Sequence, residues 1–289
     1  MKVSELLKSE KVTLSCEIFP PKQGAQLENY KNVVSELAKL KPSYISCTYG
    51  ATGGTSDYTV EIADYINSCN VPAIAHLTCV SSTKEKVHSV IEQLKERNIE
   101  NILALRGDIP SSVDFPLPDQ YHHAIELIRD IKESGDFCIG GACYPEGHPE
   151  APNMNEDLEH LKEKVDAGCE YLTTQLFYDN NIYYNFMHKA LKKGINVPVV
   201  PGIMPVTTAT QLKRSMSLTG NLVPTKFLMM VDRFADDPAA LKQAGIAYAT
   251  EQIIDLISNG VNHIHIYSMN RPEVAKAIYD NLSNIYIPG

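Results

Sequence analysis

One carboxyl group, Glu17, lies in a stretch of the chain where apolar residues predominate. Leu14, Ile18 and Phe19 surround it in the sequence, at the end of what we predict to be a buried strand. Burying a carboxylate that has no partner is costly, so packing alone does not explain its presence. Glu17 is therefore the first candidate for chemistry in this chain.

Further polar residues recur at the ends of other apolar runs. A single member has a simpler explanation, since Thr48 alone could cap a turn and Asp108 alone could be an N-cap. Their recurrence after one run and then the next exceeds what helix capping requires, and it predicts a shared site. The residues are Thr48 with Tyr49, His76 with Thr78, Arg106-Gly107-Asp108, Tyr144 with His148, Gln175, and the turn after Pro205.

The residue types exclude several familiar chemistries. Lys22 is the only lysine near the end of a predicted strand and it follows a Pro-Pro turn, so a Schiff-base aldolase lacks its nucleophile. No GxGxxG, GxxxxGK(S/T), GxSxG or HExxH motif occurs. His263 and His265 share a strand face as two metal ligands would, but no acidic partner is evident, so we interpret them as core or rim residues without a metal. The remaining groups suit a large planar organic ligand.

The elements that must position these residues alternate regularly. Apolar residues at i, i+3, i+4 and i+7, as at Tyr30, Val33, Val34 and Leu37, predict helices between the strands. Eight short strand-like runs alternate with these helices, which predicts a (β/α)8 TIM barrel. The active site of such a barrel lies at the carboxyl ends of its strands. The long gap before the last strand predicts an extra helix or two, most clearly at 239–257. The predicted strands are 12–19, 44–49, 73–79, 102–106, 137–143, 171–176, 197–203 and 263–267.

We interpret residues 1–289 as one domain. No linker or break in composition divides the chain, and its 44% hydrophobic and 21% charged residues are typical of a globular protein. The alternative is a doubly wound open sheet, which needs a glycine-rich turn after the first strand. This chain has Pro20-Pro21-Lys22 at that point, which favours the barrel.

The charge and the cysteines of the chain indicate which partners and which cellular compartment to expect. The net charge is −9 and no basic run could follow a phosphate backbone, so nucleic acid is excluded as the expected partner. The N-terminal sequence is charged throughout and no apolar run approaches the ~20 residues that span a bilayer, so we expect neither a secretory leader nor a membrane segment. Seven scattered cysteines without a CxxC pair predict buried free thiols in a reducing cytoplasm.

Eight short motifs give the chain a family likeness from about residue 11 to its C-terminus. In their order and spacing, the chain resembles methylenetetrahydrofolate reductase. The motifs are CEIFPPK (16–22), SCTYGA (46–51), AHLTC (75–79), LRGDIP (105–110), ACYPEGHPEA (142–151), KVDAG (164–168), TQLFYD (174–179) and PGIMPV (201–206). The family fold is a flavin-binding (β/α)8 barrel, in agreement with the strand pattern, and the regulatory domain of the eukaryotic members has no counterpart here.

The resemblance implies that the chain reduces 5,10-methylenetetrahydrofolate to 5-methyltetrahydrofolate through bound FAD, in one-carbon metabolism and methionine supply. Glu17 would be the general acid that protonates the folate nitrogen leaving as the imidazolidine ring opens, and the resulting iminium ion would accept hydride from the flavin. Its apolar surroundings favour the protonated form that a proton donor needs. Asp108 would lie between flavin and pterin, disfavouring the anionic reduced flavin and stabilising the developing cation.

The resemblance also assigns binding residues. Arg106 and Lys164 would serve the FAD pyrophosphate. Tyr121 and His122 fall in a loop of variable length near the adenosine half, and His160 replaces an asparagine of the familiar bacterial pattern. The full set of FAD contacts is Thr48, Tyr49, Ala51, His76, Arg106, Gly107, Asp108, Tyr121, His122, Tyr144, His148, Ala151, Asp157, His160 and Lys164.

Three further positions match the substrate-binding residues of the family: Gln175, Gln211 and Arg271. An arginine near the last strand would suit the glutamate tail of the folate or the polar groups of the electron donor. We expect a homo-oligomer, by analogy with several bacterial relatives. A flavin barrel that acts on another substrate, or an idle barrel that serves as a subunit, is the alternative function.

The chain departs from the family at the position expected to contact the electron donor. In well-known bacterial members an aromatic residue packs against the nicotinamide, whereas this chain has Ser215 there and Ala209 nearby. The loss of an aromatic face removes about 0.5–1.5 kcal/mol of stacking. Either Phe177 or Tyr178 fills the space, or a redox protein such as an iron–sulfur partner subunit reduces the flavin. We favour NADH or NADPH bound with modest affinity.

Overall fold

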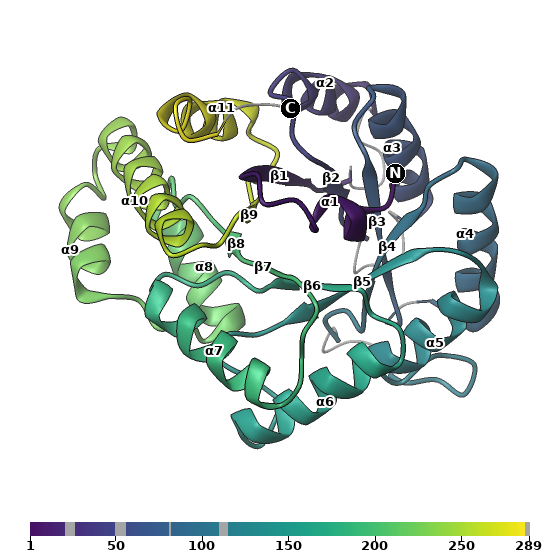
Figure 1. Ribbon diagram of the computed structural model, residues 1–289. Helices are drawn as coiled ribbons and strands as arrows, with labels where there is room; N and C mark the ends of the chain where they lie inside the picture. Colours follow the sequence, from purple (N-terminus) through teal and green to yellow (C-terminus); the bar gives the residue numbers. More distant parts are fainter. Residues whose placement is uncertain (21–26, 50–55, 81, 110–114, 287–289) are drawn as a thin grey trace.

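Parallel strands form a barrel at the centre of the molecule, and helices surround it (Figure 1). The computed structural model describes residues 1–20, 27–49, 56–80, 82–109 and 115–286. In this part of the chain the strands are β1 (Thr13–Ile18), β2 (Ile45–Cys47), β3 (Ala73–Thr78), β4 (Asn101–Leu105), β5 (Cys138–Cys143), β6 (Tyr171–Thr174), β7 (Val199–Val200), β8 (Gly202–Ile203) and β9 (His263–Ile266). The predicted TIM barrel is confirmed.

The predicted seventh strand, 197–203, is two short strands separated by Pro201. β7 pairs with β6 and β8 pairs with β9, so the sheet order β7-β6-β5-β4-β3-β2-β1-β9-β8 begins and ends on either side of this residue. Proline has no N–H to give to a ladder, and the carbonyl of Pro201 accepts a hydrogen bond from His265 N at 2.9 Å. The single residue between β7 and β8 therefore closes the barrel.

Helices follow the strands around the barrel, and several begin at a residue whose side chain caps the first turn. Asn153 accepts hydrogen bonds from two backbone N–H groups of the helix after β5, and Asp237 does the same between β8 and β9. The helices are α1 (Val3–Leu6), α2 (Leu27–Ala38), α3 (Ser56–Ser68), α4 (Lys84–Glu96), α5 (Ala124–Ser134), α6 (Met154–Asp166), α7 (Asn180–Lys192), α8 (Ala209–Thr219), α9 (Thr225–Arg233), α10 (Pro238–Ser258) and α11 (Pro272–Asn281).

Between β8 and β9 the described chain forms the three helices α8, α9 and α10. The long helix predicted at 239–257 is confirmed as α10. One of the three completes the regular βα unit of β8, and the other two are the predicted extra helices. They lie together on one side of the barrel (Figure 1).

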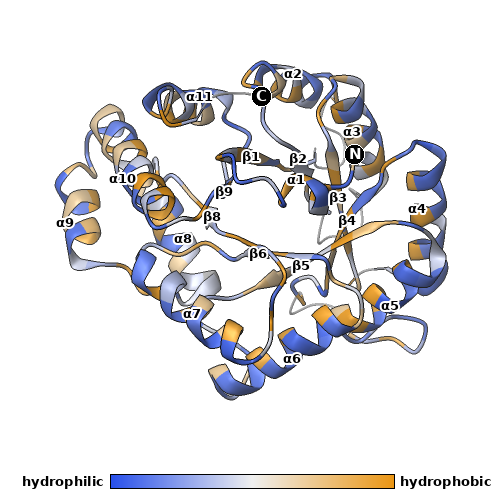
Figure 2. Ribbon diagram, in the orientation of Figure 1, coloured by the Kyte–Doolittle hydropathy of each residue, from blue (hydrophilic) through white to orange (hydrophobic). Residues whose placement is uncertain are grey.

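The main core lies between the strands and the helices, where outward-facing strand residues meet the apolar helix faces (Figure 2). A second cluster fills the barrel at the amino ends of the strands. There Val3, the first residue of α1, and Leu7, which follows the helix, pack against Tyr44, Tyr171 and Val200. The N-terminal segment thus seals the end of the barrel opposite to the expected active site.

All seven cysteines are free thiols, and only Cys69 is even partly exposed. Burial raises the pKa of the Cys16, Cys79 and Cys169 thiols to about 12, so these thiols stay protonated and unreactive at neutral pH. The expectation of buried free thiols is therefore confirmed for the other six. No helix in the described part of the chain is long and apolar enough to cross a membrane.

Candidate active site

Glu17 lies on β1 inside the barrel and is only 7% exposed. Its Oε2 atom lies 3.6 Å from Nε2 of His76 and 3.9 Å from Nε2 of His265. Ser15 Oγ lies 2.8 Å from Nδ1 of His265, and Ser46 Oγ lies 3.3 Å from Nε2 of the same ring. We call these five side chains the Glu17 cluster; it forms a polar layer inside the barrel.

Strand register brings the cluster together. Ser15 and Glu17 are two residues apart on β1, so both side chains point to the same face, which is the barrel interior. In the parallel ladders Ser15 is the partner of His265 on β9, and Glu17 is the partner of Ser46 on β2. The cluster thus depends on the closed sheet, because residues 15 and 265 meet only through the pairing of β1 with β9.

His76 is neutral at physiological pH. Burial lowers the pKa of its imidazole to about 4, although the nearby charge of Glu17 acts in the opposite direction. Its Nε2 atom is buried and makes no hydrogen bond with the residues that the structure describes. Because a buried polar atom rarely lacks a partner, this nitrogen marks a place where a bound molecule could complete the site.

The turn after β4 carries Arg106, Gly107 and Asp108 to the rim of the barrel. The Arg106 guanidinium forms a bidentate ion pair with Glu150, with Nη1 and Nη2 at 2.6 and 2.7 Å from the two carboxylate oxygens. Gly107 has a φ of +87°, and a Cβ there would lie 3.2 Å from a carbon of the β3 end, so the turn needs glycine. Burial and then the charge of Asp108 raise the pKa of Tyr144.

The loop from β5 to α6 supplies a second group of predicted FAD contacts. The rings of Tyr144 and His148 meet edge to face with centroids 4.7 Å apart. His148 N donates to Oδ2 of Asp157 at 3.1 Å, and Nζ of Lys164 donates to the Ala142 carbonyl at 2.8 Å. Burial lowers the pKa of Lys164. The structure therefore brings these predicted residues together around one loop.

Gln175 follows β6 and faces the residues of the β5–α6 loop. Its side chain interacts with Tyr144, and this contact lowers the pKa that burial has raised. Tyr267 follows β9, and its hydroxyl donates to the Thr174 carbonyl at 2.6 Å. The ring passes so close to Gly202 that a Cβ there would lie 2.3 Å from it. Tyr267 therefore crosses the barrel between the Glu17 cluster and the β6 end.

Thr48 and Tyr49 follow β2, as predicted. Thr48 accepts a hydrogen bond from Thr59 through its carbonyl, while its N–H donates to the Ile18 carbonyl at 3.0 Å. The buried Tyr49 places its hydroxyl 3.1 Å from Ser82 Oγ. Ala51, another predicted FAD contact, lies outside the described residues.

Four other predicted contacts are more peripheral. The ring of Tyr121 belongs to the main core, and its hydroxyl donates to Oδ2 of Asp130 on α5, so that this group already has a partner within the chain. His122 and His160 are exposed. Ala151 ends a turn in which its N–H donates to the His148 carbonyl at 2.9 Å.

The predicted folate positions Gln211 and Arg271 are joined through Thr207. Gln211 Oε1 accepts from Thr207 N at 3.0 Å, and its Nε2 donates to the Pro205 carbonyl at 3.2 Å. Arg271 donates to the Thr207 hydroxyl and, through Nε, to Glu273 at 3.1 Å. This chain of hydrogen bonds holds the loop after β8 against the start of α11.

Ser215 and the aromatic residues that could replace the missing ring are buried. Ser215 Oγ lies 2.8 Å from the Tyr178 hydroxyl, and Tyr178 is 1% exposed. Phe177 is fully buried and stacks on Tyr183. The idea that Phe177 or Tyr178 offers a face to a nicotinamide is therefore wrong for this conformation. Ala209, the first residue of α8, packs against the apolar cluster that contains Tyr178.

Sequence reasoning missed some members of the site. His265 does have an acidic neighbour, Glu17, which was not evident because 250 residues separate the strands that hold them. Glu150 was overlooked although it stands in the quoted 142–151 motif, next to Ala151. Both histidines 263 and 265 lie in hydrogen-bonded core positions. Within the described ranges no group of three or more His, Cys, Asp or Glu could hold a metal ion.

Comparison with known proteins identifies the family. The family model described as methylenetetrahydrofolate reductase matches residues 2–283. The chain belongs to the methylenetetrahydrofolate reductase family. Among its relatives, the 5,10-methylenetetrahydrofolate reductase of Pectobacterium carotovorum subsp. carotovorum is 37% identical over 273 residues, which cover 94% of this chain and 90% of the relative. The enzyme of the same name from Escherichia coli (strain K12) is 35% identical over 272 residues with the same coverage.

Solved structures agree on the fold. An uncharacterized protein from Clostridium thermocellum, described as binding two copies of 5-methyl-5,6,7,8-tetrahydrofolic acid, matches with a TM-score of 0.63 over 96% of both chains. Its identity to this chain is 16%, so the likeness concerns the fold alone. Every predicted site residue, from Glu17 to Arg271, lies within the segment that matches the methylenetetrahydrofolate reductase family.

Proposed function

We propose that this member of the methylenetetrahydrofolate reductase family reduces 5,10-methylenetetrahydrofolate to 5-methyltetrahydrofolate with bound FAD. The observation that carries the proposal is the Glu17 cluster, a buried carboxyl group beside two buried histidines inside the barrel. The names of relatives that match nine-tenths of the chain support the same substrate.

The residues at the rim fit FAD. The guanidinium of Arg106 and the ammonium of Lys164 are cations that suit a pyrophosphate, and they flank the loop that holds Tyr144 and His148. The unpartnered Nε2 of His76 could receive a hydrogen bond partner from the flavin ring. FAD, when bound, supplies the hydride for the reduction.

A side chain of the protein supplies the proton that the reaction needs. We infer that Glu17 holds a proton at its Oε2 carboxyl oxygen and gives it to the folate nitrogen that leaves as the five-membered ring opens. His76 is neutral and therefore adds no positive charge that would favour the carboxylate. Ser15 and Ser46 fix the orientation of the His265 ring through hydrogen bonds.

Asp108 acts through its charge. It is exposed at the rim in the described structure, and its charge raises the pKa of Tyr144. A fixed carboxylate beside the pterin would stabilise the positive charge that develops on the folate as its ring opens. Gln175, next to Tyr144, and Arg271, tied to Thr207, would bind the folate at its two ends.

NADH or NADPH remains the electron donor that we propose, with a protein donor as the second candidate because Ser215 stands where an aromatic residue is expected and is buried against Tyr178. The purified protein should be yellow, since bound flavin absorbs visible light whereas amino-acid side chains do not. Anaerobic mixing with excess NADH and then NADPH should bleach the flavin. A colourless protein that FAD cannot reconstitute would refute the proposed cofactor, and bleaching only by reduced ferredoxin or a partner subunit would refute the donor.

The free, mostly buried cysteines support our inference of a reducing, cytoplasmic location. A homo-oligomer and a single barrel domain over 1–289 stay predictions.

A further inference from the structure

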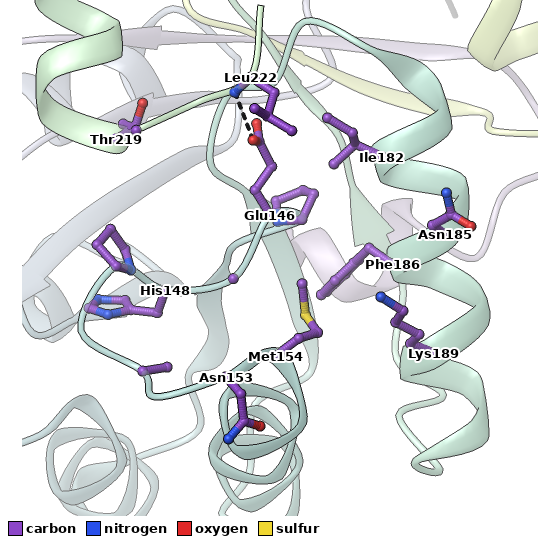
Figure 3. A pocket seen from close by; sticks show the side chains of 15 residues that line it. Glu146, His148, Asn153, Met154, Ile182, Asn185, Phe186, Lys189, Thr219 and Leu222 are labelled. Atoms are coloured by element: carbon purple, nitrogen blue, oxygen red, sulfur yellow. Dashed lines mark hydrogen bonds between the residues drawn. The ribbon is translucent and has the colours of Figure 1, made fainter.

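His265 is a buried polar ring beside Glu17, at a place where branched apolar side chains usually fill a TIM barrel. The ring is 2% exposed and is packed on two sides. It stacks on Tyr44 with centroids 5.7 Å apart and contacts Tyr267 edge to face at 5.2 Å. A cavity of about 770 Å³ between the β5–α6 loop, α7 and the α8–α9 loop is separate from the ring, because no member of the Glu17 cluster lines it (Figure 3). Solvent in that cavity therefore supplies no partner to His265.

The hydrogen bonds of Ser15 determine which nitrogen of the His265 ring carries the proton. Ser15 Oγ donates to the Ile264 carbonyl at 3.1 Å, and it lies 2.8 Å from Nδ1 of His265. A hydroxyl has one proton to give, so the same oxygen accepts from an Nδ1–H group. If the serine proton pointed to Nδ1 instead, two oxygens 3.1 Å apart would face each other without a proton between them. In a neutral ring, which has one N–H group, Nε2 is then an acceptor.

His263, two residues earlier on the same strand, has the opposite arrangement. Its Nε2 lies 3.0 Å from the Leu7 carbonyl oxygen, which can only accept, so Nε2 carries the proton. Nδ1 therefore accepts from Thr13 Oγ1 at 2.8 Å. Burial lowers the pKa of His263, although the bond to Leu7 acts in the opposite direction, so this ring is neutral at physiological pH. Both histidines have a hydroxyl partner on β1, but only His265 turns a lone pair toward Glu17.

The Nε2 atom of His265 faces the carboxyl group of Glu17. Their separation, 3.9 Å to Oε2, is longer than a hydrogen bond, and contacts between catalytic groups are often long until the substrate binds. Ser46 Oγ lies 3.3 Å from the same nitrogen. A carboxylic acid and a hydroxyl can both donate to a nitrogen lone pair, whereas a carboxylate can only accept. The nitrogen therefore matches the proton-bearing Glu17 that the proposed function requires.

We propose that His265 is a positioning residue for the reduction and acts through Glu17. In the loaded site, its Nε2 accepts from the O–H of the Glu17 carboxyl group and fixes the rotamer from which the proton passes to the folate nitrogen. At that step the O–H bond of Glu17 breaks and the N–H bond of the folate forms, while the Ser46 hydroxyl remains as the donor to Nε2. The imidazole itself gains no proton. This inference rests on the proposed function, which makes Glu17 the proton donor.

The first test determines the protonated nitrogen of each ring without any reaction. FAD-loaded protein with nitrogen-15 in its histidines is measured at neutral pH by long-range proton–nitrogen correlation, and the His263→Asn and His265→Gln variants assign the signals. The unprotonated nitrogen should be Nε2 in His265 and Nδ1 in His263. A proton on Nε2 of His265, or protons on both of its nitrogens, would overturn the inference.

The second test separates positioning from packing with two substitutions of the same ring. His265→Asn keeps an amide N–H group for Ser15 but is too short to contact Glu17, so methylenetetrahydrofolate should reoxidise the dithionite-reduced, FAD-loaded variant about tenfold more slowly. His265→Gln places an amide oxygen near the position of Nε2 and should restore the rate to within about threefold of wild type. The affinities for folate and FAD, and flavin bleaching by the donor, should change in neither variant.

A control and the possible outcomes separate this inference from the proposed function. His263→Asn is the matched control, since that ring lies on the same strand but its Nε2 contacts Leu7, and it should reduce folate at the wild-type rate. Equal rates in His265→Asn and wild type, or no recovery in His265→Gln, would overturn the role of His265 while the proposed function stands. A reduced wild-type enzyme that leaves methylenetetrahydrofolate unchanged would overturn both.

Discussion

At the scale of single residues, the site depends on how one carboxyl group is buried. Glu17 lies among side chains that are either neutral or able to hydrogen bond, and no arginine or lysine pairs with it in the described structure. The sequence predicted the acid and His76 because each ends an apolar run.

Glu17→Gln should abolish folate reduction while leaving FAD binding and flavin reduction by the donor intact. The amide keeps the shape of the side chain but has no acidic proton, and a lost general acid costs about 10²–10⁴ in rate. Separate anaerobic half-reactions measure the two steps, with the exposed acid Glu10→Gln as control. Folate turnover within about threefold of wild type would rule out this role.

Asp108→Asn should keep FAD bound and raise the reduction potential of the flavin, because a negative charge near it is removed. Flavin reduction by the donor should then become easier and folate reduction slower. Potentiometric titration checks the first effect, with Asp119→Asn in the same β4–α5 loop as control. An unchanged or lower potential would show that Asp108 does not lie beside the flavin.

His76 should make stability depend on pH. The pKa of His76 falls from an ordinary 6.5 to about 4 in the folded chain, so only the unfolded state takes up a proton between these values. The free energy of unfolding should therefore decrease by up to about 3 kcal/mol as the pH falls through that window. Denaturant titrations at several pH values should show a shallower pH slope for His76→Gln than for the wild type, and an equal slope would contradict this prediction.

At the scale of elements, close contacts between helices and loops set the geometry of the folate side. α10 approaches the loop after β8 so closely that a Cβ on Gly245 would lie 1.7 Å from the Val206 carbonyl oxygen. Thr207, the next residue, holds both Gln211 and Arg271. The position of this loop therefore depends on α10, a helix that contains none of the predicted site residues.

Gly245→Ala should destabilise the protein by about 1–3 kcal/mol, since an inserted methyl in a packed contact forces the backbone apart. The displaced loop should also raise the KM for folate more than it changes the affinity for FAD. Denaturant unfolding and steady-state kinetics measure the two effects. Ala247→Ser, on the exposed side of the same helix, serves as control; wild-type stability of Gly245→Ala would contradict the contact.

Sequence patterns predicted these elements better than their junctions. Strand and helix periods depend on local residues, and so the eight runs and the long helix α10 could be placed. The split of the seventh strand depends on what Pro201 meets across the barrel, namely His265. The pairing of Arg106 with Glu150 likewise joins residues 44 positions apart, and no local rule selects that glutamate among the neighbouring acids.

At the scale of the whole molecule, the two ends of the barrel have separate tasks. The carboxyl ends of the strands hold the polar Glu17 cluster, whereas α1 and its apolar neighbours close the amino ends. Changes at the closed end should thus affect stability without affecting chemistry.

Leu7→Ala should lower the free energy of unfolding by about 2–5 kcal/mol, because it leaves a cavity in the closed end of the barrel. The affinity for FAD at a temperature where the variant is folded should equal that of the wild type. Chemical denaturation and flavin fluorescence check the two statements, with the exposed Lys8→Ala as control. A parallel loss of FAD affinity would mean that the two ends are coupled.

The reactivity of the buried thiols can report where the barrel opens locally. Cys47 lies on β2, Cys143 on β5, and Cys169 between α6 and β6, so they sample different sectors of the wall. A thiol that stays protonated and shielded is alkylated only during moments when its sector separates from the rest. The order in which the cysteines react with an alkylating reagent, read by mass spectrometry, would therefore show where the barrel first comes apart.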